Sequence, residues 1–351
     1  MIKNLLRKNI RELTPYSCAR DEFSGVAEVF LDANENFKTY SSYDFNRYPD
    51  PHCTLLRKQL DKKLGLPFDN TVIGNGSDEL IDNLIRSFCE PKQDKIIIMN
   101  PTYGAYKVFA DINDVETVFV NYKKNFEIDF PLLEQTIENE NNLKLLFICS
   151  PNNPTGRAEE IETIEKIIKI FKGIVIVDEA YAEFSDKESC VKLVQKYENL
   201  VVLKTLSKCF AAAGIRAGIM ISNLEIVSVI NNMKAPYNVS SSTQIEALKI
   251  LDQTSKIYQQ RDEVIERRKR YFEKFKSLNY VKKIYDSDAN FLLMEVEDST
   301  YLCKKLQDKK IIIRNRTKDL YLKNCVRITI GSEEECLAVF DAIKGVENER
   351  K

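Results

Sequence analysis

The chain has 351 residues, of which 44% are hydrophobic, so it is long enough to bury a large core and suggests about two domains. Lys and Arg number 52 and Asp and Glu 53, and the resulting net charge of -1 leaves no basic excess for a nucleic acid or an anionic membrane. The apolar runs are too short to span a bilayer. We therefore expect a globular protein with neither kind of partner.

Nine cysteines are scattered along the chain, and none shows the C-x-x-C spacing of zinc and redox sites. They indicate reduced thiols in a cytoplasmic protein. Residues 1–8 are basic but hold no apolar stretch long enough for a signal peptide. The single histidine, His52, lies in a turn-like segment with two prolines, so we expect no metal site built on histidine and no Ser-His-Asp triad.

Residues 1–30 and residues 31–240 are predicted to belong to different parts of the fold. We expect residues 1–30 to pack with a smaller domain, and residues 31–240 to form a large domain. From about residue 70, short apolar runs alternate with longer amphipathic segments, which is typical of β-α units around a mostly parallel, doubly wound sheet. Helices are expected at 77–88 and 161–171, where apolar residues recur every three or four positions. Strands are expected at 71–73, 96–99, 117–120, 143–149, 174–177, 201–203 and 217–221.

Residues 241–351 are predicted to form the smaller, α+β domain. A charged helical stretch at 243–276 is followed by apolar runs at 290–294, 311–313 and 325–330, which are typical of strands, and then by a terminal helix. No linker rich in Gly, Ser or Pro separates the two domains, so they should pack closely. The fold class is therefore α/β, with a large doubly wound sheet domain and a smaller α+β domain.

Three expected strands each end in a polar motif: residues 150–156 (SPNNPTG), 178–181 (DEAY) and 205–208 (TLSK). Taken singly, these motifs are equally typical of a turn, a helix cap and a surface lysine. Parallel strands that lie side by side present their carboxyl ends at one edge, so the motifs should meet there. Lys208 is the most informative residue, because a lysine amine removed from water can form a Schiff base with an aldehyde.

A fourth motif, the glycine turn at residues 74–80 (GNGSDEL), follows the first strand and opens a helix. Backbone N–H groups at such a helix start can approach a phosphate, although an ordinary capped helix explains the turn equally well. Arg216, eight residues after Lys208, offers a forked donor that suits phosphate.

Together these motifs resemble those of the fold-type-I pyridoxal phosphate-dependent aminotransferases. The resemblance also includes residues 13–16, 31–36, 47–50, 101–103 and 326–331. It implies pyridoxal 5'-phosphate as the cofactor, amino transfer as the reaction, and a homodimer with shared active sites.

The resemblance also assigns roles at the cofactor. Lys208 would attach it covalently and later move a proton between substrate and cofactor. Asp178 would keep the pyridine nitrogen protonated, and Asn153 and Tyr181 would hydrogen-bond the ring oxygen. Tyr103 would stack on the ring. The residues around the cofactor phosphate would be Gly76, Ser77, Asp78, Thr205, Ser207, Arg216 and the partner subunit's Tyr48.

For the substrate, the resemblance implies an arginine clamp. Arg327 would bind the carboxylate of glutamate, and with Arg314 and Tyr16 it would bind a substrate phosphate. Asn34 would also contact the substrate. Without this context, the two arginines are equally typical of surface ion pairs.

The implied reaction exchanges an amino group between glutamate/2-oxoglutarate and a small phosphorylated ketone, with histidinol phosphate and imidazole acetol phosphate as the leading pair. Residues 37–45 depart from the family pattern near the site entrance. That departure leaves open a relative that converts dihydroxyacetone phosphate to serinol phosphate. A pyridoxal phosphate decarboxylase or lyase on the same fold is a further alternative. The lack of basic excess disfavours a DNA-binding regulator.

Overall fold

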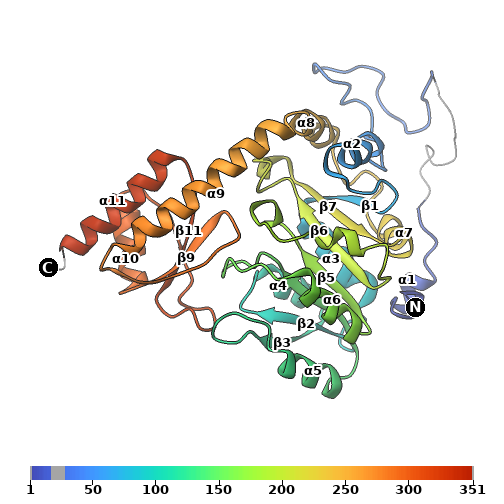
Figure 1. The fold of residues 1–351 in the computed structure, drawn as a ribbon. Coiled ribbons are helices and arrows are strands. Elements are labelled where there is room, and N and C mark those ends of the chain that lie inside the picture. Colours follow the sequence, from blue (N-terminus) through green and yellow to red (C-terminus); the bar gives the residue numbers. More distant parts are fainter. Residues whose placement is uncertain (1, 17–27, 350–351) are drawn as a thin grey trace.

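The computed structural model describes residues 2–16 and 28–349 and contains two sheets, each with its own helices (Figure 1). In the large sheet, β7 runs antiparallel to both of its neighbours and all the other pairs are parallel. The predicted α/β architecture with a mostly parallel sheet is confirmed. The large sheet has the order β1-β7-β6-β5-β4-β2-β3, with β1 (Thr71–Asn75), β2 (Lys95–Asn100), β3 (Glu116–Asn121), β4 (Leu143–Cys149), β5 (Ile174–Asp178), β6 (Leu200–Thr205) and β7 (Ala217–Ser222).

Helices cover both faces of this sheet. Side chains of a strand alternate between its faces, so Ile96 and Ile98 of β2 join the core on one side, and Ile97 and Met99 join the core on the other. Burial on both faces explains why the central strands are apolar throughout. One face is covered by α3 (Gly76–Phe88), α4 (Ala105–Ile112) and α7 (Leu224–Met233), and the other by α2 (Thr54–Leu64), α5 (Phe130–Asn139), α6 (Ile161–Ile170) and α8 (Ser241–Leu251).

Short helical turns complete the large part: η1 (Ile2–Asn4), α1 (Lys8–Arg11), η3 (Ala182–Phe184), η4 (Cys190–Leu193) and η5 (Ala213–Ile215). Ile2 and Leu6 lie in the core on the α3 side, and the N–H of Arg7 donates to the carbonyl of Ser87 at 3.1 Å. The predicted packing of this terminal segment with the smaller domain is therefore wrong for residues 2–7, whose apolar side chains cover the end of α3 instead. Cys18 and the rest of residues 17–27 lie outside the described residues.

The smaller part consists of an antiparallel sheet with helices against one face. Its strands, in the order β10-β11-β9-β8, are β10 (Arg314–Asn315), β11 (Cys325–Thr329), β9 (Phe291–Val296) and β8 (Val281–Tyr285), and its helices are α9 (Thr254–Lys276), α10 (Ser299–Asp308) and α11 (Glu333–Glu349). The prediction of a strand at 311–313 is wrong, because pairing with the neighbouring strand begins only at Arg314. Ile311 and Ile313 are apolar because they pack on the small core, while Ile312 is 77% exposed.

The two parts meet along α9, which Figure 1 shows extending from α8 into the smaller part. The stretch expected as one helix at 243–276 is broken between Leu251 and Thr254. Leu251 of α8 lies in the large core, whereas Tyr271 and Phe275 of α9 lie in the small one. The change of domain thus occurs within α9, and not at residue 241 as expected. Among the described residues, no helix is both long enough and apolar enough to cross a bilayer.

Candidate active site

A cavity of about 240 Å³ lies where β4, β5 and β6 end. The pairing register places Cys149 of β4 beside Asp178 of β5, and Asp178 beside Leu203 of β6. The three polar motifs that follow these strands therefore lie together at one edge of the sheet. The lining residues are Ser77, Asp78, Tyr103, Cys149, Asn153, Asp178, Ala180, Tyr181, Thr205, Ser207, Lys208, Ala213, Arg216 and Arg327.

Asp178 forms the buried acidic end of the cavity. It is 4% exposed, and its carboxylate accepts hydrogen bonds from the Tyr106 hydroxyl at 2.6 Å and from the Ala180 N–H at 3.0 Å. Burial raises the pKa of Asp178, while both hydrogen bonds and the charge of Lys208 oppose that rise. This carboxylate can therefore stabilise a positive charge placed against it.

Lys208 is the basic group of the cavity. Burial lowers the pKa of its amine, and the nearby positive charge of Arg327 lowers it further. Its Nζ lies 5.5 Å from the ring centroid of Tyr181. A lysine with a lowered pKa more readily supplies the uncharged amine that attacks an aldehyde.

The glycine turn lies at the same edge because β7, antiparallel to both β1 and β6, makes β1 run parallel to β6. Gly76 has a φ of +78°, and its N–H donates to the carbonyl of Arg216 at 2.8 Å. A Cβ on Gly76 would lie 2.4 Å from Nη2 of Arg216, and a Cβ on Gly218 would lie 2.2 Å from the carbonyl carbon of Gly76. Both glycines are therefore required for this close approach.

These residues form a small pocket that suits an anion. Arg216 donates to Asp78 at 3.1 Å, and the Thr205 hydroxyl donates to Ser207 Oγ at 2.9 Å. The start of α3 adds N–H groups at the positive end of a helix. Together with the lysine, the buried acid and the ring of Tyr103, this set fits each part of pyridoxal 5'-phosphate: its aldehyde, its ring nitrogen, its ring face and its phosphate.

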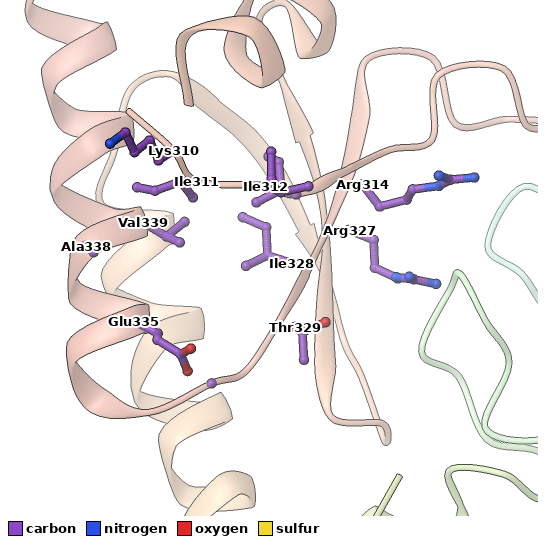
Figure 2. Close-up of a pocket in the computed structure, with 12 residues that line it drawn as sticks. Lys310, Ile311, Ile312, Arg314, Arg327, Ile328, Thr329, Glu335, Ala338 and Val339 are labelled. Atoms are coloured by element: carbon purple, nitrogen blue, oxygen red, sulfur yellow. The ribbon is translucent and has the colours of Figure 1, made fainter. Parts of the chain in front are cut away.

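Arg327 reaches the cavity from β11 of the smaller sheet. Its guanidinium donates to Asn153 Oδ1 and lies 5.2 Å from the ring centroid of Phe291. Arg314 pairs directly with Arg327 in the sheet register. Figure 2 shows both side chains extending the same way, from a cavity of about 580 Å³ that they share, and away from Val339.

Three predicted site residues lie elsewhere in this chain. Tyr48 stacks on Tyr237 with ring centroids 4.4 Å apart, and Tyr48 and Asn34 line a separate cavity of about 530 Å³. Tyr16 is 74% exposed. Within one chain, none of the three lines the Lys208 cavity.

Tyr106 was missed by the sequence reasoning. It lies three residues after Tyr103, in the first turn of α4, and its fully buried hydroxyl contacts Asp178 across 72 positions of sequence. The spacing of the two tyrosines is the only signal in the sequence, and it is equally typical of a core face. Cys149, which lines the cavity, gave no signal either.

A lysine and a buried aspartate at the carboxyl edge of a mixed seven-stranded sheet, with an anion pocket beside them, define a fold-type-I enzyme that depends on pyridoxal 5'-phosphate. The profile of the family described as aminotransferase class I and II matches residues 20–343, and the chain belongs to this family. Its reaction is therefore amino transfer.

Similar proteins agree with this assignment. A histidinol-phosphate aminotransferase of Christiangramia forsetii is 44% identical over 350 residues, with 99% of each chain covered. One of Flavobacterium johnsoniae is 42% identical over 348 residues, with 98% of each covered. The crystal structure of the histidinol-phosphate aminotransferase from Clostridium acetobutylicum has a TM-score of 0.79 and 29% identity, covering 87% of this chain and 92% of that one.

Proposed function

We propose that this enzyme exchanges an amino group between glutamate/2-oxoglutarate and histidinol phosphate/imidazole acetol phosphate. The observation that carries the proposal is the pairing of Arg314 with Arg327 on one face of the small sheet, with Arg327 extending to Asn153 in the Lys208 cavity. Phosphate and carboxylate both accept paired hydrogen bonds from guanidinium groups, so one clamp can serve both half-reactions. The relatives of 44% and 42% identity carry the matching name.

The chain's own residues divide the chemistry between them. Bound pyridoxal 5'-phosphate supplies an electron sink for the negative charge that develops on the substrate. Lys208 would carry the cofactor and move a proton at the substrate Cα. Its lowered pKa suits this work, since a base is most effective when its pKa lies near the working pH.

Other residues would hold the cofactor ring. Asp178 would lie against the ring nitrogen and keep it protonated. Asn153 and Tyr181 would hydrogen-bond the ring oxygen, and burial raises the pKa of Tyr181 so that its hydroxyl stays protonated and can donate. Tyr103 would stack on the ring, and burial likewise raises its pKa, to about 12. The residues around the phosphate would be Gly76, Ser77, Asp78, Thr205, Ser207 and Arg216.

The proposal includes a homodimer in which Tyr48 of one subunit contacts the cofactor phosphate of the other, with Asn34 and Tyr16 at the substrate. The segment that carries Asn34 and Tyr48 exposes several large apolar side chains: Leu31 is 90%, Phe37 82% and Tyr40 91% exposed. A second chain would remove that surface from water.

Mixing two inactive variants tests the shared site. Lys208→Ala and Tyr48→Ala homodimers are each expected to have little activity, whereas hybrids restore one complete site of the two. Recovery of up to about one quarter of wild-type activity in an equal mixture is expected from random pairing. No recovery, with hybrids detected by native mass spectrometry, argues against a Tyr48 contribution across subunits.

Substrate assays test the reaction itself. With 2-oxoglutarate as acceptor, histidinol phosphate should react far faster than histidinol and faster than serinol phosphate. Equal rates with histidinol phosphate and histidinol contradict the arginine clamp. Preference for serinol phosphate favours the dihydroxyacetone phosphate relative, and release of carbon dioxide identifies a decarboxylase.

A further inference from the structure

A loop of the smaller part is docked on the loop that carries Asn153. Residues 286–290 connect β8 to β9, and Asp288 lies in the middle of them. The Asp288 N–H donates to the carbonyl of Gly156 at 2.7 Å, and the Asp288 carboxylate accepts from the N–H of Ala158 at 3.0 Å. Asp288 thus uses both its backbone and its side chain to hold the end of the SPNNPTG motif.

The contact between the two loops requires glycine at position 156. Gly156 has a φ of +83°, and a Cβ on it would lie 2.5 Å from Oγ of Ser287. The Gly156 N–H donates to the carbonyl of Asn152 at 2.7 Å, and the Asn152 N–H donates to the carbonyl of Arg157 at 2.7 Å. Asn153 therefore lies in a loop closed by two hydrogen bonds, so a contact at the closed end fixes where Asn153 lies.

A buried arginine of α9 reinforces the docking. Arg268 is 9% exposed, and its Nη1 donates to the carbonyl of Ala289 at 2.5 Å and to that of Phe184 at 3.4 Å. Ala289 directly follows Asp288, and Phe184 ends the short turn that comes after Tyr181. The docked loop is therefore fastened to both motifs whose residues would hydrogen-bond the ring oxygen of the cofactor.

The docked loop leads directly to the strands that hold Arg327. Phe291, three residues after Asp288, opens β9, and β9 pairs with β11, which presents Arg327. The ring centroid of Phe291 lies 5.4 Å from that of Tyr181 and 5.2 Å from the guanidinium of Arg327. The position of Arg327 relative to Asn153 thus depends on where this loop is docked.

We propose that Asp288 is a positioning residue that holds Arg327 in place at the Lys208 cavity before a reactant binds. The inference rests on the proposed function, in which Arg327 binds the anionic groups of the reactants. An apparent dissociation constant rises as the fraction of molecules with the binding group in place falls, so a docked Arg327 binds anions more tightly. Asp288 does not line the Lys208 cavity and acts only through the loop that carries Asn153.

Loss of the Asp288 carboxylate should weaken anion binding and spare cofactor binding. Asp288→Ala leaves the Ala158 N–H without its acceptor and should raise the dissociation constant of glutarate about fivefold to tenfold. The residues that would hold the cofactor belong to the large part, so cofactor affinity should change by less than about twofold. Asp288→Asn keeps a side-chain oxygen that can accept the same hydrogen bond, and it should retain most of the wild-type affinity for glutarate.

Three measurements separate these effects. Calorimetric titration of the holoenzyme with glutarate, a dicarboxylate without an amino group to transfer, measures anion affinity. Absorbance titration of the apoenzyme with pyridoxal 5'-phosphate measures cofactor affinity. In turnover by Asp288→Ala, KM for glutamate should rise while kcat stays within about twofold, because saturating reactant draws Arg327 back into place. Hydrogen exchange followed by mass spectrometry should show faster exchange at residues 152–160 in the same variant.

Asp298→Ala is the matched control, because Asp298 also lies in the smaller part and accepts a backbone N–H, that of Tyr301 at 2.9 Å, but at the start of α10. It should lower stability through the lost helix cap and leave glutarate binding unchanged. Unchanged glutarate affinity in Asp288→Ala, or equal losses in Asp288→Ala and either Asp298→Ala or Asp288→Asn, overturn the inference. Glutarate binding does not require histidinol phosphate to be the substrate. Failure of the proposed function appears separately, as absent turnover of histidinol phosphate by the wild-type enzyme.

Discussion

Tyr106 donates a 2.6 Å hydrogen bond to Oδ2 of Asp178 beneath the cofactor cavity, and the tyrosine is fully buried. The hydrogen bond stabilises the charged form of a carboxylate whose pKa is raised by burial. Tyr106 is thus placed to keep Asp178 ionised without lining the cavity itself.

Removal of this hydroxyl should change the pH dependence of the reaction. In Tyr106→Phe, the pKa of Asp178 rises further, because one of the interactions that lowers it is lost. The ionised carboxylate exists above that pKa, so activity should be lost at a higher pH on acidification than in the wild type. Profiles of kcat/KM against pH measure the shift. An acid limb that stays in place contradicts this role for Tyr106.

Gly76 should be essential for cofactor binding. In Gly76→Ala, the new Cβ would meet Nη2 of Arg216 at 2.4 Å, and alanine is disfavoured at the φ of +78°. The apoenzyme should therefore bind pyridoxal 5'-phosphate at least tenfold more weakly, as measured by absorbance titration. Gly104→Ala is the matched control, because no atom lies within 4 Å of its Cβ position. Equal losses in both variants would point to general instability instead.

Lys208 should be the single site of covalent attachment. Reduction of the holoenzyme with borohydride should fix the cofactor to the peptide that contains Lys208, as identified by mass spectrometry. Lys208→Ala should lose this label and its turnover, while Lys192→Ala, an exposed lysine paired with Glu188, should keep both. A label on another lysine would exclude the proposed active site.

Lys204 should matter for stability. Its Nζ lies 3.0 Å from both Glu179 and Glu183, and all three side chains are largely buried. Lys204→Met would leave two buried carboxylates without their counter-charge and should lower the free energy of unfolding by about 3 to 5 kcal/mol. Urea unfolding measures this loss. Lys187→Met, which removes an exposed partner of Glu160, should change the unfolding midpoint little, and a similar loss there would weaken the argument from burial.

Strands were the most predictable part of the fold. Burial on both faces makes β4, β5 and β6 continuously apolar, so their ends, and the motifs that follow them, could be located within a residue or two. The same reasoning failed at residues 311–313, since an apolar run that packs on a core without a pairing partner has the same composition as a strand. The predicted packing of the amino-terminal residues with the smaller domain was wrong for a related reason. Ile2 and Leu6 are apolar, but nothing in the nearby sequence indicates which core they join.

At the site, the motifs on consecutive parallel strands could be predicted together, because strand order brings their ends to one edge. Contacts between residues that are distant in sequence could not be predicted in this way. Tyr106 with Asp178 and Lys204 with Glu179 depend on how separate elements pack, and each residue taken alone is an ordinary core or helix residue.

The location of the clamp on the small sheet has an evolutionary consequence. The strands that precede Asp178 and Lys208 pack in the cores of the large sheet, and the strand that presents Arg327 packs in the core of the smaller part, with α9 joining the two parts. Substitutions in the core of the smaller part can alter which reactant is accepted while the catalytic apparatus is inherited intact. Such a division allows new substrate preferences to arise by small steps from one ancestral scaffold.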